Sequence, residues 1–248
     1  MDSQINLRPI RRRSALLLLA VVAVATTLLA ANPNPGIAPP NSKPQGASYA
    51  RWGAAWWQWV FSLHANVPLN PLLTTGAVDC SYGQLRGRVW FLAGAIVSGN
   101  TTRSCEVPTG TWLFFPVLNA WSDNVAVSPP VPIETLKDGA AYFAEASELH
   151  ASVDRVPVQN LFAYRAAEAP FGYTVPATDN MLQFFGANAP GSDWPTTFVF
   201  PAASDGYWLM LKPLPPGPHT INFGGTGKNT GFQIDITYTI TVVPKGQF

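Results

Sequence analysis

The stretch SYARWGAAWWQWVFSL, residues 48–63, decides the fold. At about 100° per residue, its large apolar side chains gather on one broad face of a helix, and a narrow polar strip lies opposite. Ser48 stands where a helix N-cap is expected. The broad face consists of Tyr49, Trp52, Trp56, Trp59, Val60 and Leu63, and the strip consists of Arg51, Gln58 and Ser62. The stretch is therefore predicted to form a helix whose apolar face is covered by another layer of the protein.

Two apolar runs after this helix are candidates for that layer. RVWFLAGAIV (88–97) and TWLFFPVL (111–118) show no alternation of apolar and polar residues. Strands of this kind are buried on both faces. We expect one face to meet a second sheet and the tryptophan-rich helix to cover the other. Residues 98–100 supply a turn after the first run, and Pro116 predicts that the second strand bends or lies at a sheet edge.

The rest of the chain is rich in short β-strands. In the clearest one, 232–242, apolar and polar residues alternate throughout. A second helix is predicted over 133–149, with Ile133, Leu136, Ala140, Phe143 and Ser147 on one face. Shorter strands are expected at 151–153, 160–165, 171–175, 196–200, 207–211 and 219–223, with a turn at 154–155. These elements predict a mainly β fold, a single-domain β-sandwich or jelly roll with the tryptophan-rich helix and one further helix packed on it.

The N-terminal region carries an export signature. Arg11, Arg12 and Arg13 precede an unbroken apolar and small run over residues 15–31. Such a run predicts a secretory signal peptide, with a retained membrane anchor over residues 14–31 as the alternative. Residues 32–46, with five prolines, are predicted to be an extended linker, which leaves 47–248 as the β-sandwich domain. We therefore expect an exported protein, periplasmic or extracellular, that meets a membrane only if the N-terminal segment is retained.

Composition excludes several classes of protein. Hydrophobic residues make up 47% of the chain, which is enough for a real core and excludes intrinsic disorder. Without the first 31 residues, 11 basic and 13 acidic residues remain, so no basic field is available for nucleic acid. Cys80 and Cys105 are the only cysteines, and in an exported chain they are predicted to pair. Closing this loop is worth about 3 kcal/mol in the chain-entropy model.

Several segments of the chain resemble a group of uncharacterised bacterial exported proteins. The segments are RWGAAWWQW (51–59), GQLRGRVWFLAG (83–94), CEVPTGTWLFFPVLN (105–119), PLPPGPHTINFGG (213–225) and ITYTITV (236–242). The likeness covers most of the chain after residue 47. It implies export and a β-rich single domain, and it carries no activity, so no catalytic residue is transferred from it.

The sequence contains none of the common catalytic and metal-binding motifs. His64, His150 and His219 show no metal-ligand spacing, and G-x-S-x-G is absent. GGTGK (224–228) lacks the first glycine and the final Ser or Thr of a phosphate loop, so it is predicted to be a hairpin turn. The acids available for glycoside hydrolysis are Asp79, Glu106, Asp123, Asp179, Asp193, Asp205 and Asp235, and the sequence does not show which converge. We predict neither a cofactor nor a metal, and the catalytic residues, if any, stay unassigned.

The nine tryptophans are the one compositional bias with functional potential. Those in the helix face and in the apolar strands are assigned to the core. Trp121 and Trp194 lie in predicted loops, and Trp57 lies on the flank of the helix, so these three are candidates for stacking on a sugar ring. The leading hypothesis is a non-catalytic exported binding or structural module whose partner is a polysaccharide or another cell-envelope component. The alternatives are a secreted polysaccharide hydrolase or lyase that uses loop carboxylates, and an envelope-tethered assembly subunit.

Overall fold

The computed structural model describes residues 34, 36–65, 70–85, 87–187 and 198–247. All of them belong to one compact unit, residues 32–248. The predicted signal or anchor over residues 1–31 lies outside the described residues, as do Asp193 and Trp194. Among the described residues, no helix is long and apolar enough to span a membrane.

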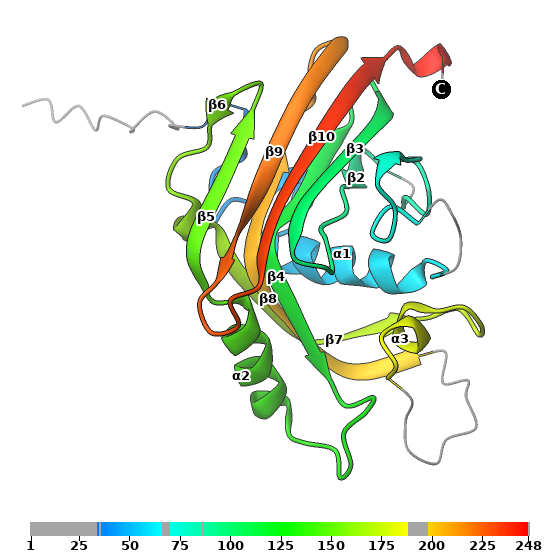
Figure 1. Cartoon of the computed structure of the whole chain (residues 1–248), viewed down its shortest axis with the longest axis vertical. Helices are drawn as coiled ribbons and strands as arrows, with labels where there is room; N and C mark the ends of the chain where they lie inside the picture. Colours follow the sequence, from blue (N-terminus) through cyan, green and yellow to red (C-terminus); the bar gives the residue numbers. More distant parts are fainter. Residues whose placement is uncertain (1–33, 35, 66–69, 86, 188–197, 248) are drawn as a thin grey trace, which may run out of the picture. The chain divides into compact units, whose positions relative to one another are not determined.

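Two packed sheets form the unit, as the sequence predicts (Figure 1). The larger sheet has the strand order β1-β3-β10-β9-β5-β6, and the smaller has the order β2-β4-β8-β7. The strands are β1 (Gly76–Ala77), β2 (Val89–Phe91), β3 (Gly99–Pro108), β4 (Trp112–Asp123), β5 (Ala146–Val153), β6 (Val156–Pro157), β7 (Arg165–Thr174), β8 (Phe198–Leu211), β9 (Gly217–Gly227) and β10 (Gln233–Val243). The helices are α1 (Tyr49–Ser62), α2 (Ile133–Ala144) and α3 (Met181–Phe184), with 3-10 turns η1 (Pro44–Gly46), η2 (Leu161–Tyr164) and η3 (Lys245–Gln247).

Strand β4 is buried on both faces, as its sequence predicts. On one side, the ring of Phe115 lies 4.7 Å from that of Phe223 on β9, so this face meets the larger sheet. On the other side, Phe114 stacks on Trp208 of β8 at 5.4 Å and meets Trp52 of α1 at 6.2 Å. The confirmed arrangement is therefore larger sheet, smaller sheet and tryptophan-rich helix, one layer upon the next.

Helix α1 begins as its sequence predicts, but its flank is buried more deeply. The Oγ of Ser48 accepts a hydrogen bond from the backbone nitrogen of Arg51, which caps the helix. Trp57, which the sequence places on the flank of the helix, is only 6% exposed, and Phe61 is fully buried. The reason is a covering from β4, whose Trp121 ring lies 4.7 Å from that of Trp57. Only the polar strip of α1 faces solvent.

The structure departs from the local sequence pattern in five places, and long-range strand pairing accounts for three of them. The helix predicted over 133–149 ends at Ala144, because the chain continues as β5 in antiparallel pairing with β9. Residues 99–108 form β3 because they pair in parallel with β10, although a turn was predicted at 98–100 and no element over 101–108. The strand predicted over 88–97 ends at Phe91, and residues 161–164 form a 3-10 turn. Of the strands predicted at 196–200 and 207–211, residues 198–200 and 207–211 belong to the single strand β8, and residues 196–197 lie outside the described residues. Pairing of this kind depends on partners far away in the chain, which a local pattern does not contain.

The predicted linker is, in part, a piece of the sheet. Ala38 donates its backbone N–H to the carbonyl of Met210, and Lys212 donates to the carbonyl of Gly36, both at 2.9 Å. Ile37 is 2% exposed and pairs with Leu211 of β8, beyond Tyr207, where the pairing of β8 with β7 stops. The expectation of an extended spacer is therefore wrong for residues 36–38, because the unpaired edge of β8 takes up their backbone groups.

Candidate functional site

An apolar pocket of about 450 Å³ lies between α1, β4, the loop after β2 and the β9–β10 hairpin. Its walls come from seven separate parts of the chain, so it exists only in the folded unit. The lining residues are Trp56, Trp57, Leu72, Ala95, Ile96, Asn119, Ala120, Trp121, Phe143, Phe185, Thr230 and Phe232. Among these described lining residues, only Asn119 and Thr230 have side chains that are mainly polar.

One wall is a cluster of aromatic rings around Trp121. Its ring lies 4.7 Å from Trp57, 5.2 Å from Phe61 and 5.3 Å from Phe185, which follows α3. Its Nε1 donates a hydrogen bond of 2.9 Å to the carboxylate of Asp123 two residues further along β4. Ring contacts and this hydrogen bond together fix the orientation of the indole.

The same carboxylate also holds β7, which lies beyond β8 in the smaller sheet. The hydroxyl of Tyr173 on β7 donates a hydrogen bond of 2.6 Å to Asp123 Oδ2. Burial and the nearby negative charge of Asp123 raise the pKa of Tyr173, so its hydroxyl stays a donor. Tyr173 in turn stacks on Phe61 of α1, with ring centroids 4.0 Å apart. Asp123 therefore links β4 to β7 by hydrogen bonds to Trp121 and Tyr173, behind the aromatic wall.

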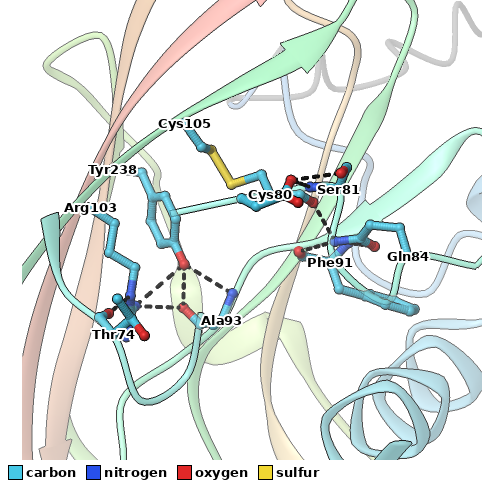
Figure 2. The surroundings of a disulfide bond; sticks show 10 residues. Thr74, Cys80, Ser81, Gln84, Phe91, Ala93, Arg103, Cys105 and Tyr238 are labelled. Carbon is cyan, nitrogen blue, oxygen red and sulfur yellow. Dashed lines mark hydrogen bonds between the residues drawn. A yellow bond between two sulfur atoms is a disulfide. The ribbon is translucent and has the colours of Figure 1, made fainter. Parts of the chain in front are cut away.

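The opposite wall is a loop held by a buried arginine. Arg103 on β3 is only 3% exposed, and its Nη1 donates to the carbonyls of Ala93 at 3.2 Å and Gly94 at 3.0 Å (Figure 2). Its Nε donates to the carbonyl of Thr74 at 2.8 Å, and its Nη2 to that of Leu72 at 3.4 Å. The guanidinium thus clamps two chain segments at once. Those segments carry three of the pocket-lining residues.

A disulfide fastens the chain close to this clamp. Cys80 and Cys105 are bonded across a separation of 25 residues, as predicted (Figure 2). Gln84 lies between Cys80 and β2, and donates hydrogen bonds to the carbonyls of Cys80 and Phe91. A disulfide of this kind suggests an oxidising compartment outside the cytoplasm.

Two nitrogen atoms of pocket-lining residues lack hydrogen-bond partners. Within the described part of the chain, neither Trp57 Nε1 nor Asn119 Nδ2 meets an acceptor, and both atoms are buried. A buried donor without an acceptor costs about 1–3 kcal/mol. The pocket therefore combines an apolar interior with two N–H groups whose hydrogen bonding is incomplete.

The structure brings two of the three predicted ligand-binding tryptophans together. Trp57 and Trp121 lie side by side in the pocket wall, whereas Trp194 is outside the described residues. Trp121 is half-buried, and other rings already contact it. The two indoles are thus parts of a pocket wall instead of free platforms on the surface.

Apart from Asp123, whose carboxylate holds the Trp121 indole, several of the acids and histidines named in the sequence are engaged away from the pocket. Asp205 forms an ion pair of 3.0 Å with Arg165, Asp235 contacts His150 at 3.3 Å, and Asp79 caps the turn at Ser81. Among the described residues, no three His, Cys, Asp or Glu side chains come together in a way that suits a metal ion. The lining residues of the pocket, all of them described, include none of these acids or histidines.

Most of the pocket escaped prediction from the sequence. Ile96, Phe143 and Phe232 belong to three distant segments, and nothing in their local pattern joins them. One signal was present, because Asn119 directly follows the eight-residue apolar run that became β4. A lone amide directly after a doubly apolar run marks a polar group that needs a partner.

The site is thus defined by its own geometry: a ring-lined wall, a clamped loop and two unpaired N–H donors. Pockets with apolar walls and few polar groups are typical of small-molecule sites. Compared with protein-family models, with curated proteins and with solved structures, the chain matches none of them.

Proposed function

We propose that the protein is a non-catalytic, exported binding module whose ligand occupies the aromatic pocket. The observation that carries the proposal is the union, in one 450 Å³ pocket, of ring-lined walls with two unpaired donors. Pockets of about 300–1,000 Å³ with few, well-placed polar groups are typical of small-molecule sites. The ligand is a component of the cell envelope or of the extracellular medium, where an exported domain meets it.

Two features support a location outside the cytoplasm. The disulfide between Cys80 and Cys105 fits an oxidising compartment. The arginines and the apolar run of residues 11–31 have the composition of a secretory signal. We propose a periplasmic or extracellular location on these grounds, and mass spectrometry of the mature N-terminus tests it.

The chemistry of the pocket wall favours binding over hydrolysis. General acid–base chemistry needs a carboxylate or imidazole within hydrogen-bond reach of the substrate. The lining residues, all within the described part of the chain, offer only an amide, a hydroxyl and indole N–H groups. These groups orient a ligand by hydrogen bonds.

Occupancy of the pocket is testable with a neutral fluorescent probe. N-phenyl-1-naphthylamine is expected to bind the full chain saturably with a rise in emission. Ala95→Phe places a ring in the pocket and is expected to weaken probe binding at least tenfold. Ala126→Phe, at an exposed site away from the pocket lining, is the matched control and is expected to bind as the unmodified protein does. Equal affinity in both variants, or no saturable binding at all, would refute the pocket as the ligand site.

A further inference from the structure

We infer that the ligand is a neutral, mainly apolar ring compound with a carbonyl or ether oxygen that accepts hydrogen bonds from Trp57 Nε1 and Asn119 Nδ2. The inference rests on the proposed function and names the ligand class of the same pocket. It replaces the polysaccharide expected from the sequence with a molecule that has few hydroxyl groups.

The unpaired indole of Trp57 is unlike its neighbours on α1. Trp52, Trp56 and Trp59 donate their indole N–H groups to the carbonyls of Pro44, Leu92 and Tyr82 at 2.9, 2.9 and 3.2 Å. Trp57 is just as buried as a packed residue of the helix, at 6% exposure, yet its N–H has no acceptor. Three of the four indole N–H groups on α1 thus have acceptors within the protein, and only that of Trp57, a residue of the pocket wall, has none. This contrast points to an acceptor that a ligand supplies.

Asn119 supplies a second donor on the same face of β4 as Trp121. The two residues are two positions apart on the strand, so their side chains project to one side, where α1 lies. Asn119 lines the pocket and is half-buried, and its Nδ2 is sealed from water. Rotation of this amide presents the N–H to a molecule inside the pocket. A hydrogen bond formed between these apolar walls is stronger than one at the open surface.

The charge and polarity of the walls select against other ligand classes. Among the described lining residues, none has an ionised side chain, so a carboxylate or ammonium ligand would be buried without a counter-charge. A polysaccharide has several hydroxyl groups per ring, whereas the wall offers few polar partners. Each hydroxyl group left unpaired in an apolar pocket weakens binding. A ligand with one or two acceptor oxygens avoids both penalties.

A matched pair of probes isolates the acceptor oxygen. Benzophenone and diphenylmethane have nearly the same size and differ at the carbonyl group. Their affinities for the full chain, measured by isothermal titration calorimetry, are expected to differ about 3- to 10-fold in favour of benzophenone, as one net hydrogen bond of about 0.5–1.5 kcal/mol predicts. Benzoate and cellotetraose test the charged and the polyhydroxylated classes, and both are expected to bind at least tenfold more weakly than benzophenone.

The donor is identified by substitution and by NMR. Trp57→Phe is expected to remove the preference for benzophenone while diphenylmethane still binds, and Asn119→Leu is expected to reduce the preference. Trp52→Phe is the control, because that indole already donates to Pro44, and it is expected to keep the preference. In ¹H–¹⁵N spectra, the Trp57 indole signal is expected to move downfield with benzophenone and not with diphenylmethane.

The results separate this inference from the proposed function. If the two aromatic probes bind the pocket equally, or if cellotetraose binds it more tightly than benzophenone, the ligand class is wrong and the binding function stands. If no compound binds and Ala95→Phe changes nothing, the proposed function fails and the inference fails with it.

Discussion

Gly53 of α1 lies directly against the indole of Trp208 on β8, and a Cβ atom at residue 53 would be 2.9 Å from Cε2 of that ring. Alanine favours a helix over glycine by up to about 1 kcal/mol. Overpacking a buried contact costs about 1–3 kcal/mol, so the clash wins. Gly53→Ala is therefore expected to lower the free energy of unfolding, as measured with urea. Arg51→Ala, on the exposed strip of the same helix, is the control; greater stability of Gly53→Ala would contradict this account of the contact.

The reciprocal burial of α1 and β4 is the part of the fold that the sequence predicts best. A strand that is apolar on both sides needs two covers, and the tryptophan face needs something to cover; each pattern explains the other. β10 is predicted equally well, because apolar and polar residues alternate along the full strand. β3 and residues 146–150 of β5 were missed because their hydrogen-bond partners are on β10 and β9, more than 70 residues away in the chain.

The candidate site was predictable only in fragments, for the same reason. Trp57 and Trp121 each stood out as aromatic residues outside the expected core. Their contact depends on the packing of α1 against β4. The wall that contains Leu72, Ala95 and Ile96 depends on the hydrogen bonds of Arg103 to the same two chain segments. Arg103 itself gave no local signal, because an arginine in a strand is normally solvent-exposed.

The segment before α1 is expected to contribute directly to stability. Ile37 is 2% exposed, and the backbone on either side of it is hydrogen-bonded to β8. Ile37→Ala is expected to lower the free energy of unfolding by about 2–5 kcal/mol, because it leaves a cavity beneath the sheet. Val156→Ala, at a site that is 67% exposed, is expected to change it by less than about 0.5 kcal/mol. Equal effects at the two sites would mean that residues 36–38 behave as the extended linker that their composition suggested.

Replacement of the buried guanidinium is expected to loosen one wall of the pocket. Arg103→Lys keeps the charge but loses the planar fork that serves the carbonyls of Leu72, Thr74, Ala93 and Gly94 together. The expected loss of stability is about 2–4 kcal/mol, because hydrogen bonds of charged groups are worth about 1.5–3 kcal/mol each. Binding of N-phenyl-1-naphthylamine is expected to weaken in the same variant. Arg51→Lys, at an exposed site, controls for the chemistry of the substitution. If Arg103→Lys is as stable as the unmodified protein, the hydrogen bonds of the Arg103 guanidinium do not contribute to the free energy of unfolding.

Loss of the disulfide is expected to destabilise the protein without changing its fold. The double variant Cys80→Ala and Cys105→Ala opens a loop closed across 25 residues, which corresponds to about 3 kcal/mol in the chain-entropy model. Dithiothreitol is expected to lower the stability of the unmodified protein to the level of the variant, and to leave the variant unchanged. An unmodified protein that is indifferent to the reductant would show that the bond contributes nothing to the free energy of unfolding.

The ion pair between His219 and Asp154 is expected to make stability depend on pH. Nδ1 of His219 lies 2.7 Å from Asp154 Oδ2 and Nε2 lies 2.9 Å from the carbonyl oxygen of Pro215, so both ring nitrogens face acceptors and the doubly protonated ring fits best. Partial burial opposes both charged groups. The hydrogen bonds outweigh it, so that the pKa of His219 is raised and the pKa of Asp154 is lowered.

These two pKa shifts define a window of pH. A raised histidine pKa stabilises the fold fully below the unfolded value of 6.5, and the effect is lost as pH rises through the folded pKa. A lowered aspartate pKa stabilises it above the unfolded value of 3.8, and the effect is lost as pH falls through the folded pKa. The difference in unfolding free energy between the unmodified protein and His219→Gln is therefore expected to be largest between these two values. Because Asp154 is half exposed, we expect this difference to be at most about 1 kcal/mol.

A double-mutant cycle distinguishes the pair from any general effect of pH. Asp154→Asn is expected to remove the same pH-dependent difference, and adding His219→Gln to it is expected to have little further effect. Urea unfolding at pH 5, where both groups are charged, and at pH 8.5, where the imidazole is neutral, gives the coupling energy of the pair in each state. A coupling of equal size at both pH values would show that the two side chains interact as neutral hydrogen-bonding groups, because only the charged pair loses its stabilising energy when the imidazolium gives up its proton.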